Sequence, residues 1–523
     1  MTSVETLAQL ITRQASERPD EVFLMFEDET FNFADLEQRV RRYASSLSEF
    51  GIRRGDRIGL MMRNHPDHIF LYLALSWLGA TNVEYSIHLK QAGLEIQLED
   101  AEPRFIFADS VFANELDLAA KILPTLENII WFGDGYPASS LAVSSNTILD
   151  NLPVTDAVSI HDFDRIQTIS YTSGTTGKPK GVMLSERWFQ IGAKNAGLLA
   201  DIRQDDVIFL WEPFFHIAGW MSVLMSLQHG VPIAMVAQFS GSKCWDQIRR
   251  YRATLLHYLG GAMNILLKQP ARPDDRDNPV RVAWGAAAPS QSWCEFEHRF
   301  GLTVHEGYGI SEAQNLTHIN IGGPVGSIGK PVTEFDCLIE AEDASLQPPG
   351  KIGEIVLKPS QPNIIMAGYF RDEKRTAETL QNGCVYTGDI GYQDDDGYFY
   401  FSGRQKDSLR HRGENVSAWE VERVVNAHPA VEESAVIGVP SPMGEQDIKV
   451  FLKLVDNKSL NPIELIKWCE QQLAYYQVPR FIEFVADFPR GPTQRIRKSE
   501  LPTSVHGNWD LEQSGHKIRN NNT

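Results

Sequence analysis

The chain has 523 residues, more than a single hydrophobic core usually serves, so at least two domains are expected. Hydrophobic residues make up 42% and aromatic residues 10% of the chain, which excludes a disordered protein and is ordinary for a globular enzyme. The formal net charge of −19 argues against bulk attraction to nucleic acid or anionic membranes, so an anionic ligand needs a local cluster of donors.

The N-terminal segment predicts an amphipathic helix rather than a signal peptide, because Leu7, Leu10 and Ile11 follow helical spacing among polar and acidic residues. The longest apolar run, "IFLYLALSWLGA" at residues 69–80, is too short for a membrane span and predicts a buried helix that ends at Gly79. The five cysteines are scattered without CxxC spacing, which favours reduced thiols over a disulfide framework or a zinc site. Together these features predict a cytoplasmic protein without a membrane span.

Short runs of strand-forming residues alternate with helical patterns through much of the chain. They include "RIGLMM", "RFIFAD", "DVIFLW", "PIAMVA", "ATLLHYLG", "VRVAWGAA" and "LTVHEGYG". Strands that are apolar on both faces and separated by helices predict parallel sheets covered by helices. After about residue 335 the pattern changes to turn-rich β segments.

From about residue 405 the pattern becomes a small α+β unit. "SAWE" at residues 417–420 predicts a capping box at the start of one helix, and Asn461 with Pro462 opens another. The predicted fold class is therefore α/β, with a large N-terminal domain of α/β layers that contains a β-rich part, and a small α+β C-terminal domain. The expected domains are residues 1–403 and 404–503, and the polar residues 504–523 are expected to form a flexible tail.

The stretch "SYTSGTTGKPKGVML" at residues 170–184 follows a predicted strand and contains little that can pack. Glycine, serine and threonine expose backbone N–H groups and hydroxyls, so the stretch can wrap a polyphosphate while Lys178 or Lys180 supplies charge. A flexible surface loop is the alternative for such a composition. The spacing of Gly174 and Gly177, with Pro179 after Lys178, does not match the GxxxxGK[ST] P-loop.

The whole string closely resembles the phosphate-binding motif of the acyl-adenylate-forming (AMP-binding) superfamily, which includes acyl-CoA synthetases, luciferases and peptide-synthetase adenylation domains. Further segments resemble the other motifs of this superfamily in the same order. They are "PFFH" at 213–216, "WGAAAPS" at 284–290, "EGYGISE" at 306–312, "YTGDIG" at 386–391 and "SGRQKDSLRHRGENVSAWEVE" at 402–422. The resemblance covers roughly residues 5–501 and implies that the small domain is mobile about a hinge at Lys406.

Within the superfamily the chain looks most like bacterial carnitine/crotonobetaine-CoA ligases and related short- or medium-chain acyl-CoA synthetases. Segments such as "CWDQIRRYRAT", "FFHIAGW" and "WCEQQLAYYQVP" carry this similarity. The resemblance implies that a small or medium carboxylic acid attacks ATP to give an acyl-adenylate and pyrophosphate, and that coenzyme A then takes the acyl group and releases AMP. The implied cofactors are ATP, Mg²⁺ and coenzyme A.

The resemblance also assigns roles to individual residues. Glu312 is expected to hold Mg²⁺, Ser311 to meet a phosphate oxygen, and His216 to gate the acyl pocket. Asp389 is expected to accept both ribose hydroxyls, a task that suits the two oxygens of a carboxylate. The expected phosphate-binding residues are Thr172, Ser173, Gly174, Thr175, Thr176, Gly177 and Lys180. The other expected nucleotide- or CoA-binding residues are Gly285, Ala286, Tyr308 and Gly309 near adenine, Arg404 near the ribose, Lys406 at the hinge and Gly413 near pantetheine. A simple turn between a strand and a helix is the alternative for the segment around Gly413, and an ordinary core histidine beside two phenylalanines is the alternative for His216.

One segment departs from the superfamily pattern. Where the family carries a lysine in a GKIxRxxL-like segment, "PRGPTQRIRKSEL" at residues 489–501 places Arg495. Arginine keeps the charge, but its planar fork distributes donors differently from an ammonium group. Three interpretations are open: Arg495 does the work of the lysine, Arg497 or Lys498 reaches in from a shifted register, or adenylation is weak.

The acyl pocket is expected around Trp220 and residues 257–263, 284–286 and 309–310. Two tryptophans and a tyrosine there suggest a compact pocket that stacks a ring or holds a quaternary ammonium group by cation–π contact, although ordinary packing is the commoner role of such residues. A long fatty acyl chain is not expected.

Three functions are open at this stage. The first is an AMP-forming acid–CoA ligase, the second an adenylating ligase with an amine acceptor that gives an amide, and the third a weakly catalytic adenylate-binding homologue, which only Arg495 supports. In each case the partner is a small-molecule carboxylic acid, with no nucleic acid and no membrane span, and the chain is also compatible with a homodimer.

Replacing Arg495 with alanine tests the first interpretation of the altered segment. If Arg495 bridges the acyl carboxylate and the α-phosphate, Arg495→Ala should depress pyrophosphate formation far more than acyl transfer from a supplied acyl-adenylate. The two half-reactions are measured separately, by pyrophosphate release and by thioester formation. Equal loss in both would contradict the assignment.

Overall fold

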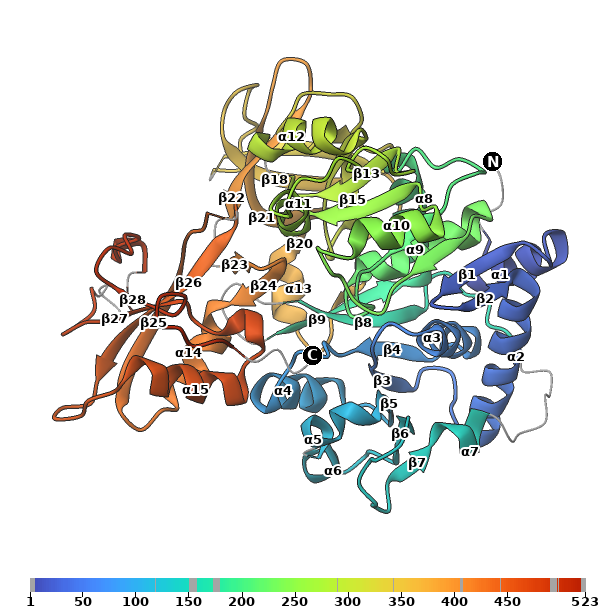
Figure 1. Cartoon of the computed structure of the whole chain (residues 1–523), viewed down its shortest axis with the longest axis horizontal. Helices are drawn as coiled ribbons and strands as arrows, with labels where there is room; N and C mark the ends of the chain where they lie inside the picture. The colour runs from blue at the N-terminus through green and yellow to red at the C-terminus, as the bar shows by residue number, and fades with distance from the viewer. Residues whose placement is uncertain are drawn as a thin grey trace.

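The computed structural model describes residues 5–117, 119–149, 158–172, 179–288, 290–341, 343–404, 408–442, 444–489, 496 and 498–518. Its large domain is built on two mainly parallel sheets that share one hydrophobic core (Figure 1). In the described residues the first sheet has the order β19 (Gly368–Tyr369), β9 (Lys180–Ser185), β8 (Ile166–Thr172), β4 (Thr81–Glu84), β3 (Arg57–Met61), β5 (Phe105–Asp109), β6 (Asn128–Phe132) and β7 (Ala142–Ser144).

The second sheet carries most of the predicted strands of the middle of the chain. Its order is β16 (Lys330–Pro331), β15 (Gln314–Asn320), β14 (Thr303–Ile310), β13 (Val282–Ala286), β12 (Leu255–Leu259), β10 (Ile208–Leu210), β11 (Ile233–Met235), β1 (Val22–Phe26) and β2 (Glu29–Asn32). Strands β11, β10, β12, β13 and β14 run parallel, as do β4, β3 and β5 in the first sheet. The prediction of parallel α/β layers is therefore confirmed.

Helices fill the space between the sheets and cover their outer faces. The shared core contains α1 (Leu7–Glu17), α2 (Phe33–Phe50), α3 (Pro66–Leu78), α7 (Ser145–Leu149), α8 (Glu186–Leu199) and α9 (Ile217–His229). The first sheet is covered outside by α4 (Gln91–Ala101), α5 (Ala113–Leu116) and α6 (Ala119–Ile122), and the second by α10 (Cys244–Tyr251), α11 (Gly260–Leu267) and α12 (Ser290–Phe300).

Helix α3 confirms the prediction for the long apolar run. Nearly every side chain of this helix is buried, and it ends at Gly79, whose φ of 75° closes the helix in the left-handed region that glycine adopts without strain. No helix in the described ranges is long and apolar enough to cross a membrane. All five cysteines are free.

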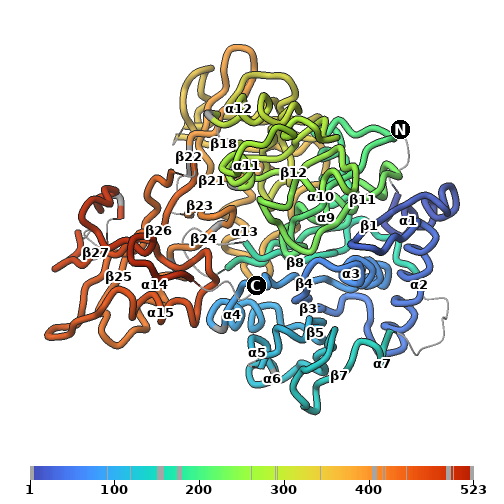
Figure 2. Tube along the Cα trace, viewed as in Figure 1, coloured from blue at the N-terminus to red at the C-terminus, as the bar shows by residue number. Residues whose placement is uncertain are grey.

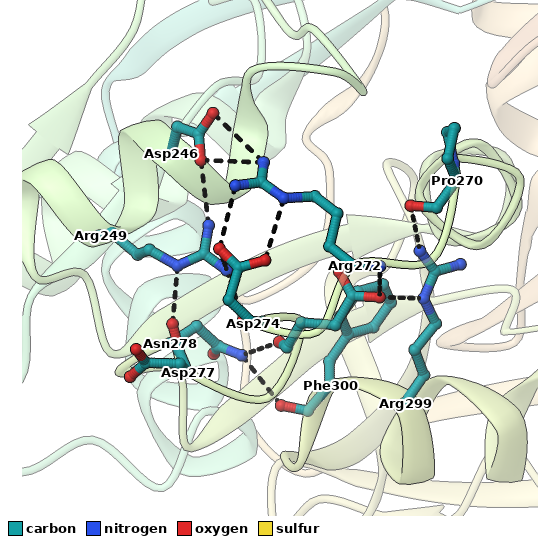
Figure 3. A network of polar contacts seen from close by, with 10 residues as sticks. Asp246, Arg249, Pro270, Arg272, Asp274, Asp277, Asn278, Arg299 and Phe300 are labelled. Atoms are coloured by element: carbon teal, nitrogen blue, oxygen red, sulfur yellow. Dashed lines mark hydrogen bonds and ion pairs between the residues drawn. The ribbon is translucent and has the colours of Figure 1, made fainter.

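An ion-pair network fastens the loop before β13 to the outer helices (Figure 3). Arg272 bonds Asp246 of α10 at 3.2 Å and Asp274 at 2.9 Å, while Arg249 of α10 donates to the Asp277 carbonyl at 2.6 Å. Arg299 of α12 donates to the Pro270 carbonyl at 3.1 Å. Because most of these side chains are partly exposed, each pair adds little stability, and the network serves mainly to fix the course of the loop.

A β-rich part follows, as predicted. It is an antiparallel sheet of β17 (Phe335–Glu340), β18 (Gly353–Pro359), β20 (Leu380–Gln381), β21 (Cys384–Gln393) and β22 (Phe399–Arg404), with α13 (Glu373–Thr379) beside it. Its apolar face packs on Tyr308 of β14 and on Ala313, which lies between β14 and β15 of the second sheet. This packing brings the turn before Asp389 next to the end of β14.

The small C-terminal domain lies to one side and is entered from β22 (Figures 1 and 2). It consists of the hairpin β23 (Ser408–His411) and β24 (Glu414–Ser417), the sheet β25 (Val431–Pro440), β26 (Gln446–Leu454), β27 (Phe481–Phe484) and β28 (Trp509–Asp510), and the helices α14 (Ala418–Asn426) and α15 (Pro462–Gln472). Both helices share a core with the sheet. A large N-terminal and a small C-terminal domain are thus present.

Two expectations for this domain need correction. The capping box at the start of α14 does not form, because Glu420 is drawn away to accept a hydrogen bond from the Gln477 side chain at 2.5 Å. The stretch after residue 503, expected to be a flexible tail, instead pairs Trp509 and Asp510 with β27 and buries Leu511 in the core of the domain. The apolar side chains of Trp509 and Leu511 explain why this otherwise polar segment packs.

Candidate active site

A cleft of about 550 Å³ lies where β8 ends, β9 begins and β14 ends, and the small domain contributes one of its walls. Of the sequence-predicted residues, the cleft is lined by Thr172, Lys180, His216, Gly309, Ser311, Glu312 and Gly413. Ala286, Tyr308 and Asp389 lie next to lining residues along the chain or across a strand pair, and Gly285 precedes Ala286 in β13. The structure therefore gathers most of the predicted set around one space.

Some of the predicted residues cannot be placed in this way. Ser173, Gly174, Thr175, Thr176, Gly177, Lys406 and Arg495 lie outside the described residues. The backbone of Arg404 is described and pairs with Asp389 in the β21–β22 ladder, which agrees with a position near the same ligand group.

Tyr308 and Asp389 meet from two different sheets. The Tyr308 hydroxyl donates a hydrogen bond of 2.7 Å to Oδ2 of Asp389. Asp389 is only 1% exposed. A phenol fixes the direction of a carboxylate without cancelling its charge. This pair can therefore present an oriented, negatively charged acceptor to hydroxyl groups of a ligand.

The turn after β13 is held by the buried side chain of Glu306, a residue that was not predicted from the sequence. Glu306 accepts hydrogen bonds from the Ala288 N–H at 3.1 Å and from the Tyr258 hydroxyl. Ala287 has a φ of 62°, which is uncommon for a residue with a side chain and shows that the turn is tightly determined. A Cβ on Gly285 would lie 1.9 Å from the Tyr258 carbonyl oxygen, so only glycine fits there.

Burial raises the pKa of Glu306 to about 8, and the hydrogen bonds from Tyr258 and the turn oppose this only in part. The carboxyl group accepts hydrogen bonds from the backbone of the turn and so stabilises its conformation. The signal for Glu306 was available in the motif "EGYGISE", but a glutamate at that place is not distinguishable by pattern from an exposed one.

A second residue missed from the sequence is Tyr369 on β19. Its hydroxyl donates to Oε1 of Glu312 at 2.7 Å, and the ammonium group of Lys180 lies 3.4 Å from the same hydroxyl. Burial raises the pKa of Tyr369, with the nearby Glu312 charge adding to the effect, so the phenol remains a donor. Tyr369 thus links the lysine that follows the Gly-rich loop to the acidic residue at the end of the β14 motif.

The donor set around Glu312 fits Mg²⁺ in one specific manner. Within the described part of the chain, no group of three His, Cys, Asp or Glu side chains could hold a metal ion. Mg²⁺ is commonly bound by one or two carboxylates together with waters and substrate phosphates. A single carboxylate oriented by Tyr369 on the cleft wall suits an ion that arrives with a polyphosphate, and does not suit a preformed site made of protein ligands alone.

His216 connects the two domains across the cleft. It immediately precedes α9, and its Nε2 lies 2.9 Å from the Glu414 carboxylate of the small domain. Burial disfavours the charge of Glu414, but the attraction of His216 outweighs this and lowers the pKa of Glu414 below its ordinary value. Gly413, with a φ of 81°, forms the turn that brings Glu414 to this place.

Aromatic residues flank this contact. His88 packs edge-on against Phe215 and Tyr475, with ring centroids 5.8 and 5.1 Å apart, and burial lowers the pKa of His88 to about 4. His88 is therefore neutral at physiological pH. The passage between the domains is walled here by uncharged rings next to the hydrogen bond between His216 and Glu414.

The expected aromatic acyl pocket is not what the structure shows. Trp220 stacks on Tyr72 with ring centroids 3.6 Å apart, and Trp284 packs edge-on against His257, so both indoles belong to the core between the sheets and do not line the described cleft. The cleft is lined near His216 by the apolar side chains of Phe215, Ile217, Ala218, Leu259 and Ile310. The tryptophans are turned inward because their strand and helix positions face the shared core.

Comparison with known protein families gives two matches. The model of the AMP-binding enzyme family matches residues 11–370, and that of the AMP-binding enzyme C-terminal domain matches residues 420–495. The first alone covers well over half of the chain.

Comparison with individual proteins agrees with the family matches. The crotonobetaine/carnitine–CoA ligase of Salmonella agona is 30% identical over 517 residues, covering 95% of this chain and 99% of that protein. A double mutant of o-succinylbenzoate CoA synthetase from Bacillus subtilis, bound to a product analogue, superposes with a TM-score of 0.84 at 26% identity, covering 96% and 99% of the two chains. The same synthetase in complex with AMP gives a TM-score of 0.68 at 26% identity, with coverage of 94% and 97%.

Replacing Glu306 with glutamine should change the dependence of stability on pH. The pKa of Glu306 is raised from 4.5 to about 8 in the folded protein, so as the pH rises the unfolded chain loses this proton first. The free energy of unfolding of the wild type should therefore fall between about pH 5 and 8. Relative to the wild type, that of Glu306→Gln should rise by up to about 1 kcal/mol per pH unit over this range. Urea unfolding followed by tryptophan fluorescence at several pH values measures the difference.

The exposed Glu295 on the neighbouring helix α12 provides the control, since Glu295→Gln removes a carboxyl group that water already solvates. A difference between wild type and Glu306→Gln that stays constant from pH 5 to 8 would show that Glu306 titrates normally.

Proposed function

The chain belongs to the AMP-binding enzyme family, and from this premise we propose that it activates a small or medium carboxylic acid with ATP and transfers the acyl group to coenzyme A. In the first half-reaction a carboxylate oxygen attacks the α-phosphate, and pyrophosphate leaves. In the second, the thiol sulfur attacks the acyl carbon, AMP leaves and the thiol proton is released. The products are the acyl-CoA thioester, AMP and pyrophosphate.

The observation that carries the proposal is the arrangement of the cleft. Lys180 and Glu312 lie on the large-domain wall of the cleft and are joined through the Tyr369 hydroxyl. Elsewhere in the cleft, His216 of the large domain contacts Glu414 of the small domain. One space therefore offers groups for a polyphosphate and an entrance between two domains for a second substrate, which is what a two-step transfer requires.

In the first half-reaction the chain has to position the phosphates and balance their charge. We assign Thr172, Lys180 and the loop residues 173–177 to the β- and γ-phosphates, and the Ser311 hydroxyl to a phosphate oxygen. Glu312 would hold Mg²⁺, which when bound neutralises phosphate charge and orients the leaving group. Tyr369 keeps the Glu312 carboxylate in place for this role.

The nucleoside is assigned to the space beside these residues. Asp389, oriented by Tyr308, would accept the ribose hydroxyls, and Arg404 lies opposite Asp389 in the strand pair. Gly285, Ala286 and Gly309 would frame the adenine, because glycine allows the backbone to approach a flat ring closely. Glu306 fixes the turn that directly follows Gly285 and Ala286 in β13.

For the second half-reaction we assign His216 and Gly413 to the passage for the thiol. The contact between His216 and Glu414 holds the imidazole against the small domain, which supports an open path beside it. The similarity scores point the same way. Because the two compared structures are of the same synthetase, the higher score of the product-analogue complex supports an arrangement of the domains suited to the transfer step. Adenylation would then need the small domain to turn about Lys406 and bring Arg495 to the phosphates.

The acid is proposed to be small or medium in size. The cleft has a volume of about 550 Å³, and Phe215, Ala218, Leu259 and Ile310 form an apolar part of its lining. The Salmonella relative is named for crotonobetaine and carnitine, both compact acids. These two observations support a compact substrate and leave its identity to experiment.

A panel of carboxylic acids with ATP and Mg²⁺ tests the function directly. AMP and pyrophosphate release should be strong only with an acid of suitable size, and AMP release should depend on coenzyme A. Glu312→Ala should lower pyrophosphate release by about 100-fold or more, since it removes the carboxylate that holds the metal. The release of both products is followed with coenzyme A, without it, and with amines as acceptors.

The other outcomes distinguish the alternatives. AMP release that depends on an amine instead of coenzyme A would identify an amide-forming ligase. If no acid gives pyrophosphate, the chain is an adenylate-binding homologue without efficient turnover, and the proposed ligase activity is wrong.

Glu414→Gln tests the role of the contact between the domains. The substitution keeps the shape but removes the charge that attracts His216, and a charge-assisted hydrogen bond is worth enough that thioester formation should fall by about 10-fold. Pyrophosphate release without coenzyme A should stay within about twofold, since that step does not use the contact. Rapid mixing with a supplied acyl-adenylate measures the first rate.

Glu432→Gln is the matched control, because Glu432 lies in the same domain, is exposed and pairs with Lys453 away from the cleft. Equal loss in both half-reactions of Glu414→Gln would instead indicate a general effect on the fold.

A further inference from the structure

Helix α13 forms part of the cleft wall. Arg375 and Thr379 of this helix line the cleft together with Lys180, Tyr369 and Glu312. The helix follows β19 directly, and β19 pairs with β9, the strand that begins at Lys180. The chain therefore returns, almost two hundred residues later, to the strand after the Gly-rich loop.

The first turn of α13 is tied firmly to β19. The Tyr369 N–H donates to Oγ1 of Thr376 at 2.8 Å, and this hydroxyl donates in turn to the Asp372 carbonyl at 2.8 Å. The Asp372 carboxylate accepts from the Arg375 N–H at 3.0 Å and caps the helix. Because these bonds fix the backbone at both ends of the turn, the backbone position of Arg375 is well determined.

The Arg375 side chain forms an ion pair through its Nε atom. Within the described residues its ion-pair partner is Asp372, reached by Nε at 3.4 Å, and the side chain is 28% exposed. The positive charge of Arg375 is close enough to the Tyr369 hydroxyl to favour its ionised form, although burial of the phenol dominates its pKa. The guanidinium thus lies on the cleft wall, near the hydroxyl that joins Lys180 to Glu312.

We propose that Arg375 binds the terminal phosphates of ATP and the pyrophosphate that leaves, as a second cation beside Lys180. The proposal rests on the proposed ligase function, because it names a residue for the polyphosphate of that reaction. A guanidinium presents donors in a planar fork that matches two phosphate oxygens, whereas an ammonium group acts as a point charge. Arg375 therefore complements Lys180 rather than duplicating it.

The charge of the surroundings supports this assignment. The chain carries a net charge of −19, so the repulsion felt by a polyphosphate has to be offset by cations inside the cleft itself. Glu378 also lines the cleft, but it is exposed at the rim, where water and salt screen its charge. Arg375, half-buried beside Tyr369, faces less screening and so has the larger effect on an anion.

The test compares Arg375→Ala and Arg375→Lys with Lys374→Ala. Lys374 is the neighbouring cation on α13, but it is exposed and does not line the cleft, so its variant removes the same charge without the proposed contact. Calorimetry with inorganic pyrophosphate, with and without Mg²⁺, and with AMP gives a readout that does not depend on turnover.

Arg375→Ala should weaken pyrophosphate binding by about 10-fold, the effect of losing one charge-assisted pair, and should leave AMP binding unchanged. In the adenylation step the KM for ATP should rise by about the same factor, while acyl transfer from a supplied acyl-adenylate stays within about twofold. Arg375→Lys should recover part of the loss, and Lys374→Ala should match wild type.

The inference is overturned if Arg375→Ala binds pyrophosphate as tightly as Lys374→Ala and wild type do. Its failure is distinguishable from failure of the proposed function. An enzyme that turns over an acid but shows no effect at Arg375 refutes only the inference. A protein that turns over no acid, yet binds pyrophosphate through Arg375, refutes only the ligase assignment.

Discussion

The cleft exists because two parallel sheets share one core and end their strands at the same place. Helix α3, buried on nearly all sides, and the helices α8 and α9 fill the space between the sheets, so the spacing between the sheets is set by close packing of apolar side chains. Polar groups at strand ends cannot be buried in such a core. Thr172, at the end of β8, and Ser311, just after β14, are therefore left at the edge, where both line the cleft.

A shared device orients the carboxylates around this cleft. Glu312 is held by Tyr369 and Asp389 by Tyr308, each through a phenol hydroxyl. An arginine in these places would orient a carboxylate equally well but would also cancel its charge. A phenol donates one hydrogen bond and leaves the negative charge for a metal ion or for hydroxyl groups. This explains how an acidic protein can use carboxylates next to a polyphosphate, provided that the cations are supplied separately.

Much of the fold and part of the candidate site could be predicted from the sequence. The features that could not be predicted depend on contacts between residues that are distant in sequence. Strands such as β12 and β13, the helix ended by Gly79 and the cleft residues Ser311 and Glu312 all lie within continuous local patterns. Tyr369 and Arg375 could not be found, because their partners are distant in sequence and no local pattern marks a residue that returns to a motif. The inward direction of Trp220 and Trp284 depends on which sheet face is buried, and the order after residue 503 depends on packing of Trp509 and Leu511 against a distant strand.

The interface between the domains has the properties that two successive reactions in one cleft demand. Its described contacts include two polar ones, His216 with Glu414 and Arg423 with the Ala92 carbonyl at 2.8 Å, and apolar ones, the rings around His88 and Ala92 against the core of the small domain. Single contacts of this kind contribute about 1–3 kcal/mol each, so the small domain can be released without unfolding either core. A large apolar interface would fix one arrangement, and the same cleft could then serve only one of the two half-reactions. The hydrogen bond between His216 and Glu414 instead helps to specify the present arrangement, because a shift of either domain separates the two groups.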